Sequence, residues 1–143
     1  MSSTLQQWED KIIERIQNNI DTLLIDGEPT GLKVIAHPDD VKKFKPIGKG
    51  NILVRYDGSA YREPSGRAQQ KMVTFAVIII MRSLRTTPVT VGIYSALEII
   101  SQSLQGWILS AGRGYQIDEE FIGENDGYWY YRSRFRFPHT QTI

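Results

Sequence analysis

Residues 72–81 read MVTFAVIIIM, a run that is apolar at every position except Thr74. Successive side chains of a strand point to opposite faces, so a strand with this composition is apolar on both faces and needs cover on both. The run is far shorter than the ~20 residues that a helix needs to span a bilayer. The stretch up to Leu84 therefore predicts the central strand of a sheet.

Two other segments have the periodicity of amphipathic helices, with apolar residues every three or four positions. The first stripe consists of Leu5, Trp8, Ile12, Ile16, Ile20 and Leu23. The second consists of Ile93, Leu97, Ile100 and Leu104. Ser3 or Thr4 can cap the start of the first helix, and Asp26-Gly27 is expected to end it. The second helix opens after Pro88 and is expected to end at Gly106.

Four more segments are predicted strands, at residues 32–36, 52–56, 115–122 and 128–137. The last alternates strictly, with Trp129, Tyr131, Ser133, Phe135 and Phe137 on one face and Tyr128, Tyr130, Arg132, Arg134 and Arg136 on the other. Residues 57–70 are rich in turn formers and predict a long connection. Residues 39–44 predict one helical turn capped by Asp39. Residues 138–143 are expected to be a loose end.

The element order is therefore α-β-β-β-α-β-β. It predicts an α+β fold, in which an antiparallel-rich sheet of four to five strands has two main helices packed on one or both of its faces. A length of 143 residues suits a single domain that spans residues 1–143.

The composition excludes several kinds of chemistry. The chain has no cysteine, which excludes disulfide scaffolds, thiolate-bound zinc, iron–sulfur clusters and thiol catalysis. The formal net charge is only +1, yet residues 1–32 are acidic and residues 33–85 are basic. Such segregation is typical of complementary patches on a protein that associates with itself or with an acidic partner. The N-terminal residues do not resemble a secretory signal, so we expect a cytoplasmic protein.

The sequence contains no catalytic constellation. His37 and His139 are its only histidines, and neither lies in a nucleophile motif. His37 beside Asp39 and Asp40 is better explained as a turn than as a metal site. Gly48-Lys49-Gly50 lacks the spacing of a phosphate-binding loop and precedes a strand. We therefore expect no enzyme and no catalytic, cofactor-binding or metal-binding residues.

Two groups of side chains are instead candidates for contacts with another subunit or a partner protein. The first lies in the 57–70 connection and consists of Tyr61, Arg62, Glu63 and Arg67. The second combines the arginine stripe with two acidic residues of the preceding strand: Arg132, Arg134, Arg136, Asp118 and Glu120. Three interpretations of the stripe stay open, namely pairing with the acids across the hairpin, contacts between subunits, and binding of a phosphate backbone with bases stacked on the tyrosines.

Three motifs carry a resemblance to a known family. They are Leu53-Val54-Arg55-Tyr56 in one strand, Met81-Arg82-Ser83-Leu84-Arg85 at the end of the apolar strand, and Gly92-Ile93-Tyr94 at the start of the second helix. With their surroundings, over roughly residues 5–137, they resemble the Mu-like family of phage tail proteins. That family is placed among the tail terminators of contractile-tailed phages and related injection systems.

The resemblance implies a structural protein of the virion tail, assembled in the host cytoplasm. Such proteins form a homohexameric ring at the head-proximal end of the tail tube and sheath, stop tail polymerisation, and present a docking surface to a neck or connector protein. DNA would pass through the lumen without specific binding, and no membrane would take part. Two other interpretations stay open: another neck or baseplate component of a contractile tail, and a nucleic-acid-binding module.

Overall fold

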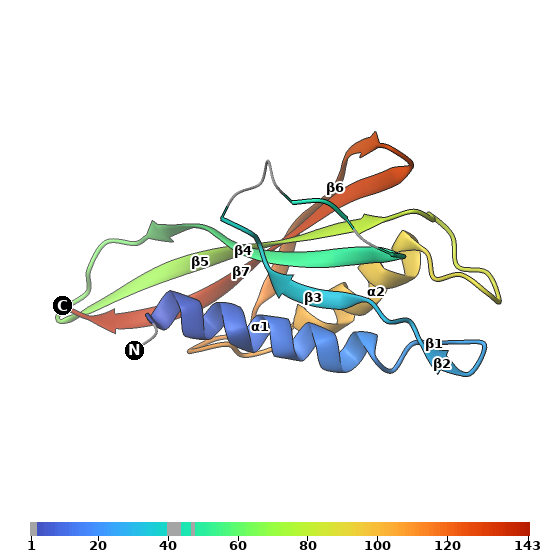
Figure 1. Ribbon diagram of the computed structural model, residues 1–143. Helices are drawn as coiled ribbons and strands as arrows, with labels where there is room; N and C mark the ends of the chain where they lie inside the picture. The colour runs from blue at the N-terminus through green and yellow to red at the C-terminus, as the bar shows by residue number, and fades with distance from the viewer. Residues whose placement is uncertain (1–2, 40–43, 47) are drawn as a thin grey trace.

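The computed structural model describes residues 3–39, 44–46 and 48–143 (Figure 1). Within these residues the chain forms two helices and seven strands. In chain order they are α1 (Thr4–Ile20), β1 (Leu24–Ile25), β2 (Glu28–Pro29), β3 (Lys33–Ala36), β4 (Gly50–Tyr61), β5 (Ala68–Met81), α2 (Ile93–Leu104), β6 (Tyr115–Asn125) and β7 (Tyr128–Thr142). The helical turn predicted at residues 39–44 lies largely outside the described residues. Neither described helix is long and apolar enough to cross a membrane.

Five of the strands form one sheet in the order β3-β4-β5-β7-β6. Neighbouring strands are antiparallel except β3 and β4, which run parallel. The strand that contains the apolar run, β5, is central, as its composition predicts. The predicted α+β fold with an antiparallel-rich sheet is therefore confirmed. The short strands β1 and β2 form a separate hairpin.

Both helices pack on the same face of the sheet, so the main core lies between the helices and that face (Figure 1). α1 begins as predicted, because Ser3 Oγ accepts a hydrogen bond from the Gln6 amide at 3.1 Å. Its buried residues are Trp8, Ile12, Ile16 and Ile20. They pack with the strand residues of the same face, chiefly Ile52, Val54, Val73, Phe75, Val77, Ile79, Phe135 and Phe137.

The opposite face of the sheet has neither of the two described helices over it, and we call it the open face. It carries the alternate strand residues, such as Arg55, Ala76, Ile78 and Arg134. Part of it is apolar, since Leu53, Ile78, Ile80 and Tyr128 form a second, smaller buried cluster with Phe44 and Tyr130 packed against it. The apolar run of β5 is thus buried on both faces, but on the open face its cover is made of side chains and not of either described helix.

The first helix ends earlier than predicted. It stops at Ile20, with Asp21 as its C-cap, and Asp26-Gly27 forms the turn between β1 and β2. Both turn residues have positive φ, 53° and 77°, as a tight two-residue hairpin turn requires. The Asp-Gly pair is therefore a hairpin turn and not a helix stop.

The long connection predicted at residues 57–70 is wrong, because most of it is strand. β4 continues to Tyr61 and β5 begins at Ala68, so residues 62–67 alone connect them. The register shifts between Tyr56 and Gly58, and Gly58 has a φ of 125°. A β-bulge of this kind admits one extra residue and lets the pairing continue beyond it.

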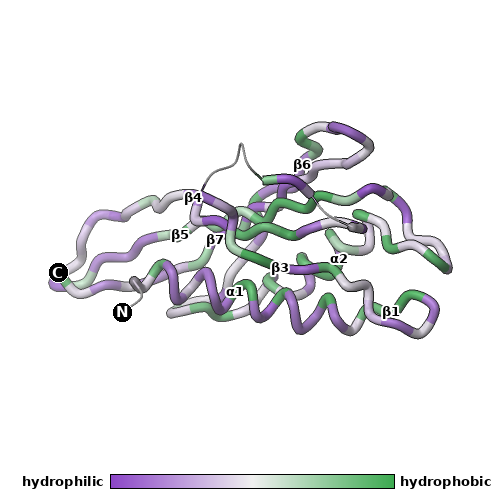
Figure 2. Tube along the Cα trace, viewed as in Figure 1, coloured by the Kyte–Doolittle hydropathy of each residue, from purple (hydrophilic) through white to green (hydrophobic). Residues whose placement is uncertain are grey.

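The loose end predicted at residues 138–143 is also wrong, because β7 runs to Thr142, opposite Ala68 of β5. The ends of β4, β5 and β7, residues 57–72 and 138–142, together form an arm that extends beyond the helices (Figure 1). Figure 2 shows that this arm is mostly hydrophilic, whereas the middle of the sheet is hydrophobic. We call the connection at its end, residues 62–67, the hairpin tip.

Candidate functional site

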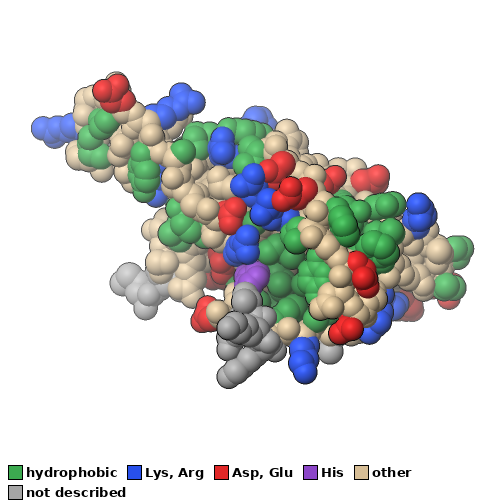
Figure 3. All heavy atoms as spheres, turned by 90° about the horizontal axis from the view of Figure 1, so that it is seen from above, with side chains coloured by type: hydrophobic (Ala, Val, Ile, Leu, Met, Phe, Trp, Pro, Cys, Tyr) green, Lys and Arg blue, Asp and Glu red, His purple; other side chains and the backbone are tan. Residues whose placement is uncertain are grey.

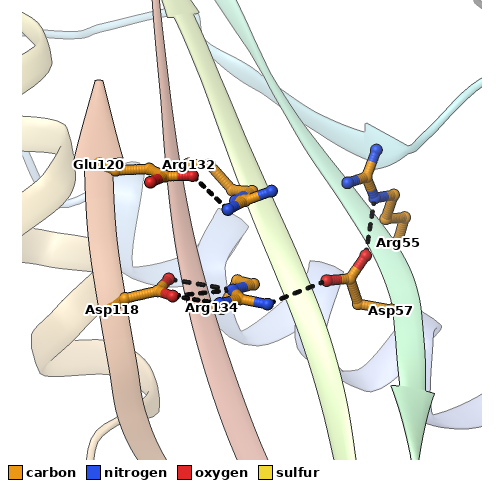
Figure 4. Close-up of polar contacts among 6 residues, drawn as sticks. All are labelled: Arg55, Asp57, Asp118, Glu120, Arg132 and Arg134. Atoms are coloured by element: carbon orange, nitrogen blue, oxygen red, sulfur yellow. Dashed lines mark hydrogen bonds and ion pairs between the residues drawn. The ribbon is translucent and has the colours of Figure 1, made fainter. Parts of the chain in front are cut away.

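The open face carries charged side chains from three strands (Figure 4). Alternate residues of each strand point to this face, which brings together side chains far apart in the sequence. The six residues are Arg55 and Asp57 of β4, Arg132 and Arg134 of β7, and Asp118 and Glu120 of β6, and we call them the ion-pair ladder.

Arg134 lies at the centre of the ion-pair ladder. Its Nε donates hydrogen bonds to both carboxylate oxygens of Asp118, at 3.1 and 3.0 Å, and its Nη2 donates a further one to Oδ2. On the other side, its Nη1 lies 3.8 Å from Asp57 Oδ2. The two remaining pairs join Arg132 to Glu120, and Arg55 to Asp57 with Nε and Oδ1 3.2 Å apart.

A small residue makes the contact across the sheet possible. Ala76 of β5 lies opposite Arg55 of β4 on one side and Arg134 of β7 on the other. Since Ala76 has only a methyl group, Arg134 can extend over β5 and reach Asp57. Three strands are thereby joined by side chains in addition to their backbone hydrogen bonds.

The surroundings favour the charged form of the central pair. The hydrogen bonds from Arg134 are the largest influence on Asp118, and they lower the pKa of its carboxyl below the ordinary value. The same hydrogen bonds raise the pKa of the Arg134 guanidinium. Each side chain of the pair is 33% exposed, so solvent screens the attraction and limits its contribution to the stability of the fold.

Arg136, the third arginine of the predicted stripe, does not join the ion-pair ladder. It lies opposite Thr74 of β5 and Tyr115 of β6. Its Nε is buried and has no hydrogen-bond partner among the described residues, and the same holds for Nε of Arg132. The structure thus shows the predicted pairing with acids for Arg132 and Arg134, while contacts of the stripe with another subunit stay a prediction.

An apolar hollow adjoins the charged residues on the open face. Its volume is about 250 Å³, and its lining residues are His37, Phe44, Leu53, Ile78, Ile80, Ile122 and Tyr130. Ile122 is 51% exposed at its rim. Figure 3, which looks onto the open face, shows acidic and basic side chains gathered at the centre with hydrophobic side chains beside them.

The second predicted group lies far from the first, at the end of the arm. Tyr61 is the last residue of β4, and Arg62, Glu63 and Arg67 belong to the hairpin tip. The Arg62 amide donates to the Gln70 carbonyl at 2.9 Å, and the Ile143 amide donates to the Arg67 carbonyl at 2.8 Å. Backbone hydrogen bonds thus fix the base of the tip, whereas its side chains face solvent. The predicted residues therefore form two separate surfaces.

The two histidines have separate and ordinary surroundings. His37 Nδ1 lies 3.0 Å from the Pro38 carbonyl oxygen. His139 Nδ1 lies 2.6 Å from Ser110 Oγ, and its ring packs edge-on against Trp8 with centroids 4.7 Å apart. Burial, followed by the charge of Lys71, lowers the pKa of His139. Within the described part of the chain, no group of three or more His, Asp or Glu residues is placed to hold a metal ion.

Sequence reasoning missed two members of the ion-pair ladder, Arg55 and Asp57. The signal was present, because both belong to alternate positions of the strand that begins at Gly50. It was concealed by the glycine and serine that follow Asp57, which are typical of a loop.

Comparison with models of known protein families gives a match. The family described as Gp37 protein matches residues 13–142, from the middle of α1 to the end of β7. No curated protein matches the chain.

Proposed function

The chain belongs to the Gp37 protein family, a family of phage proteins, and from this premise we propose that it is a tail terminator. In this role it forms a hexameric ring on the head-proximal end of the tail tube and sheath. The ring stops tail polymerisation and presents the surface on which the neck or connector docks. The protein acts through contacts with other proteins and not through catalysis.

The observation that carries the proposal is the open face. It combines an apolar hollow with charged side chains that are already paired within the chain. Protein interfaces have this composition, with apolar anchors at the centre and satisfied polar groups around them. A nucleic-acid surface instead needs cations free to replace the counterions of phosphates.

The shape of the molecule supports a ring. A closed ring is built from heterologous contacts, in which one surface of a subunit meets a different surface of the next. The arm and the body offer two different surfaces (Figure 1). The tail tube, the sheath and the neck protein would then contact the remaining faces, and DNA would pass through the lumen without specific binding.

The first experiment measures the mass of the purified protein over a concentration series, with negative-stain images of the same samples. A six-fold ring is expected. An even-numbered assembly that is not a ring would contradict the proposal.

The second experiment removes the gene from a phage that encodes it and measures tail length by electron microscopy. Tails without the protein are expected to be overlong and headless, and labelled protein is expected at the head-proximal end. Tails of normal length would overturn the terminator role. Label at the opposite end would favour a baseplate component instead.

A further inference from the structure

A groove separates α2 from the first half of β6, on the body of the molecule. Its volume is about 560 Å³, within the range of roughly 300–1,000 Å³ typical of binding pockets. The lining includes Tyr94, Glu98 and Ser101 of α2 and Gln116 to Glu119 of β6, and it contains no lysine or arginine. Glu98 and Glu119 are exposed, and within the described residues neither forms an ion pair. The groove therefore presents unpaired negative charge.

Exposed aromatic residues continue from the groove along the sheet. Tyr94, at its rim, packs edge-on against Tyr131 with ring centroids 6.5 Å apart, and Phe121 packs against Tyr131 at 5.5 Å. Tyr94 is 41% exposed and Phe121 is 53% exposed. Aromatic residues left partly exposed beside a groove are typical of the centre of a protein interface, and they do not suit a site for a small cation.

The hairpin tip has the complementary chemistry. Arg62 and Arg67 are exposed, and within the described chain neither forms an ion pair. Tyr61 beside them is 57% exposed, with Lys71 Nζ 5.5 Å from its ring centroid. The tip is narrow, protruding and held by strand pairing at its base, so inserting it into a groove costs little conformational entropy.

The tip and the groove of one subunit cannot meet each other. Figure 1 draws the hairpin tip at the left end, beside the C-terminus, and α2 in the right half of the molecule. Complementary surfaces at separate places on one chain meet only between copies, and such a contact repeats from one subunit to the next.

We propose that the hairpin tip of one subunit inserts into the groove between α2 and β6 of the next copy of this chain. Arg62 and Arg67 then face Glu98 and Glu119, and Tyr61 joins the aromatic residues at the rim. This inference rests on the proposed function, because the contact between tip and groove is the heterologous contact that closes the proposed ring.

Disulfide crosslinking tests the contact directly. The chain has no cysteine, so every disulfide in a variant joins introduced residues. Ser65→Cys in the tip and Ser101→Cys in the groove, combined in one chain, are expected to give a ladder of covalent oligomers that ends at the hexamer under mild oxidation. Each single variant can give dimers at most. Ser65→Cys with Asn18→Cys, on the exposed side of α1, is the matched control and is expected to give no ladder.

Charge reversal provides a second, independent test. The tip variant Arg62→Glu/Arg67→Glu and the groove variant Glu98→Arg/Glu119→Arg are each expected to raise the protein concentration needed for half-assembly at least tenfold. An equal mixture of the two is expected to assemble as the native protein does, because every tip then finds a groove of opposite charge. Lys33→Glu, on β3, is the control for a single surface reversal.

The outcomes separate this inference from the proposed function. Native rings that tolerate both charge reversals, with no covalent ladder from Ser65→Cys/Ser101→Cys, overturn the inference and leave the terminator proposal intact. A ladder of covalent oligomers and rescue by mixing, both observed with purified protein, support the inference. If the phage tails also keep normal length without the protein, the terminator role is overturned while the inference stands. Circular dichroism of each variant shows whether it is folded. If a charge-reversal variant is unfolded, the crosslinking experiment alone decides whether the tip contacts the groove.

Discussion

At the scale of single residues, one of the small side chains of the open face decides whether a contact across the sheet can form. Ala76 is fully buried, and its short side chain leaves room above β5 for Arg134 to reach Asp57. A valine or leucine at this position would fill that space and push the guanidinium away. The ion-pair ladder therefore depends on an alanine in β5, the strand between β4 and β7.

The central pair makes a testable contribution to stability. Arg134→Glu places a third carboxylate between Asp118 and Asp57 and is expected to lower the free energy of unfolding by about 1 kcal/mol, the scale of cross-strand charge pairs. The exchange variant Asp118→Arg/Arg134→Glu is expected to recover much of this loss. Urea denaturation measures the native protein, Arg134→Glu, Asp118→Arg and the exchange variant, with Lys33→Glu as a surface control. An exchange variant no more stable than the sum of its single changes would refute the pairing.

His139 predicts how stability depends on pH. Its pKa in the folded chain is lowered, by burial first and by Lys71 second, from an ordinary value of about 6.5. The unfolded chain then takes up the proton first as the pH falls, so stability is greatest above about pH 6.5 and is lost on acidification below it. His139→Gln is expected to remove this loss between pH 7 and pH 5, and His37→Gln, the other histidine, is expected to keep it. Equal slopes in both variants, from thermal denaturation, would contradict the assignment.

At the scale of elements, strand faces could be predicted from the sequence and strand ends could not. The alternation of residues 128–137 places Phe135 and Phe137 in the core and Arg132 and Arg134 on the open face, as the structure confirms. The same alternation stops at Pro138, although β7 continues to Thr142. The arm pairs through backbone N–H and C=O groups, which do not depend on the side chain, so its polar side chains carry no periodic signal. Two bulges in β6 likewise cannot be found by counting residues.

Two of the motifs that carry the family resemblance meet in the structure. The Ile93 and Tyr94 amides donate to the carbonyl oxygens of Ser83 and Leu84, at 2.8 and 3.0 Å. The segment after β5 thus caps the first turn of α2, which has no side-chain cap. Gly92 permits this approach, since a Cβ there would lie 2.3 Å from the Arg85 carbonyl carbon.

Replacing this glycine tests the close approach. Gly92→Ala is expected to lower the free energy of unfolding by roughly 1–3 kcal/mol, the usual cost of forcing extra volume into a packed site. Gly123→Ala is the matched control, because a Cβ at Gly123 meets no atom within 4 Å. Urea denaturation of both variants provides the comparison, and equal losses would show that the contact between the two motifs is not tight.

At the scale of the whole molecule, charge is segregated along the chain but largely paired on the open face. The net charge is +1, and two arginines of the stripe that could track a phosphate backbone are occupied by Asp118 and Glu120. Under the proposed function, DNA passes through a ring of this protein and needs only weak contact with it. The pairing of these arginines is consistent with that requirement.

DNA binding provides the corresponding measurement. Fluorescence anisotropy with a labelled duplex at physiological salt is expected to show an affinity weaker than the roughly 10⁻⁴–10⁻⁶ M typical of non-specific DNA binding under that condition. Asp118→Asn/Glu120→Gln, which frees the guanidiniums, is expected to bind more tightly and with a steeper dependence on salt. Tight, salt-dependent binding by the unaltered protein would favour the nucleic-acid-binding alternative.

The outer strands of the sheet have one more consequence. β3 has four residues, and the pairing of β6 is interrupted by two register shifts. Neither of these two strands offers the long, flat row of free backbone groups on which strands of other chains add to form fibrils. Under the proposed function the subunit waits in the crowded host cell until a tail reaches full length, and these two strands then give fibrils little to grow on.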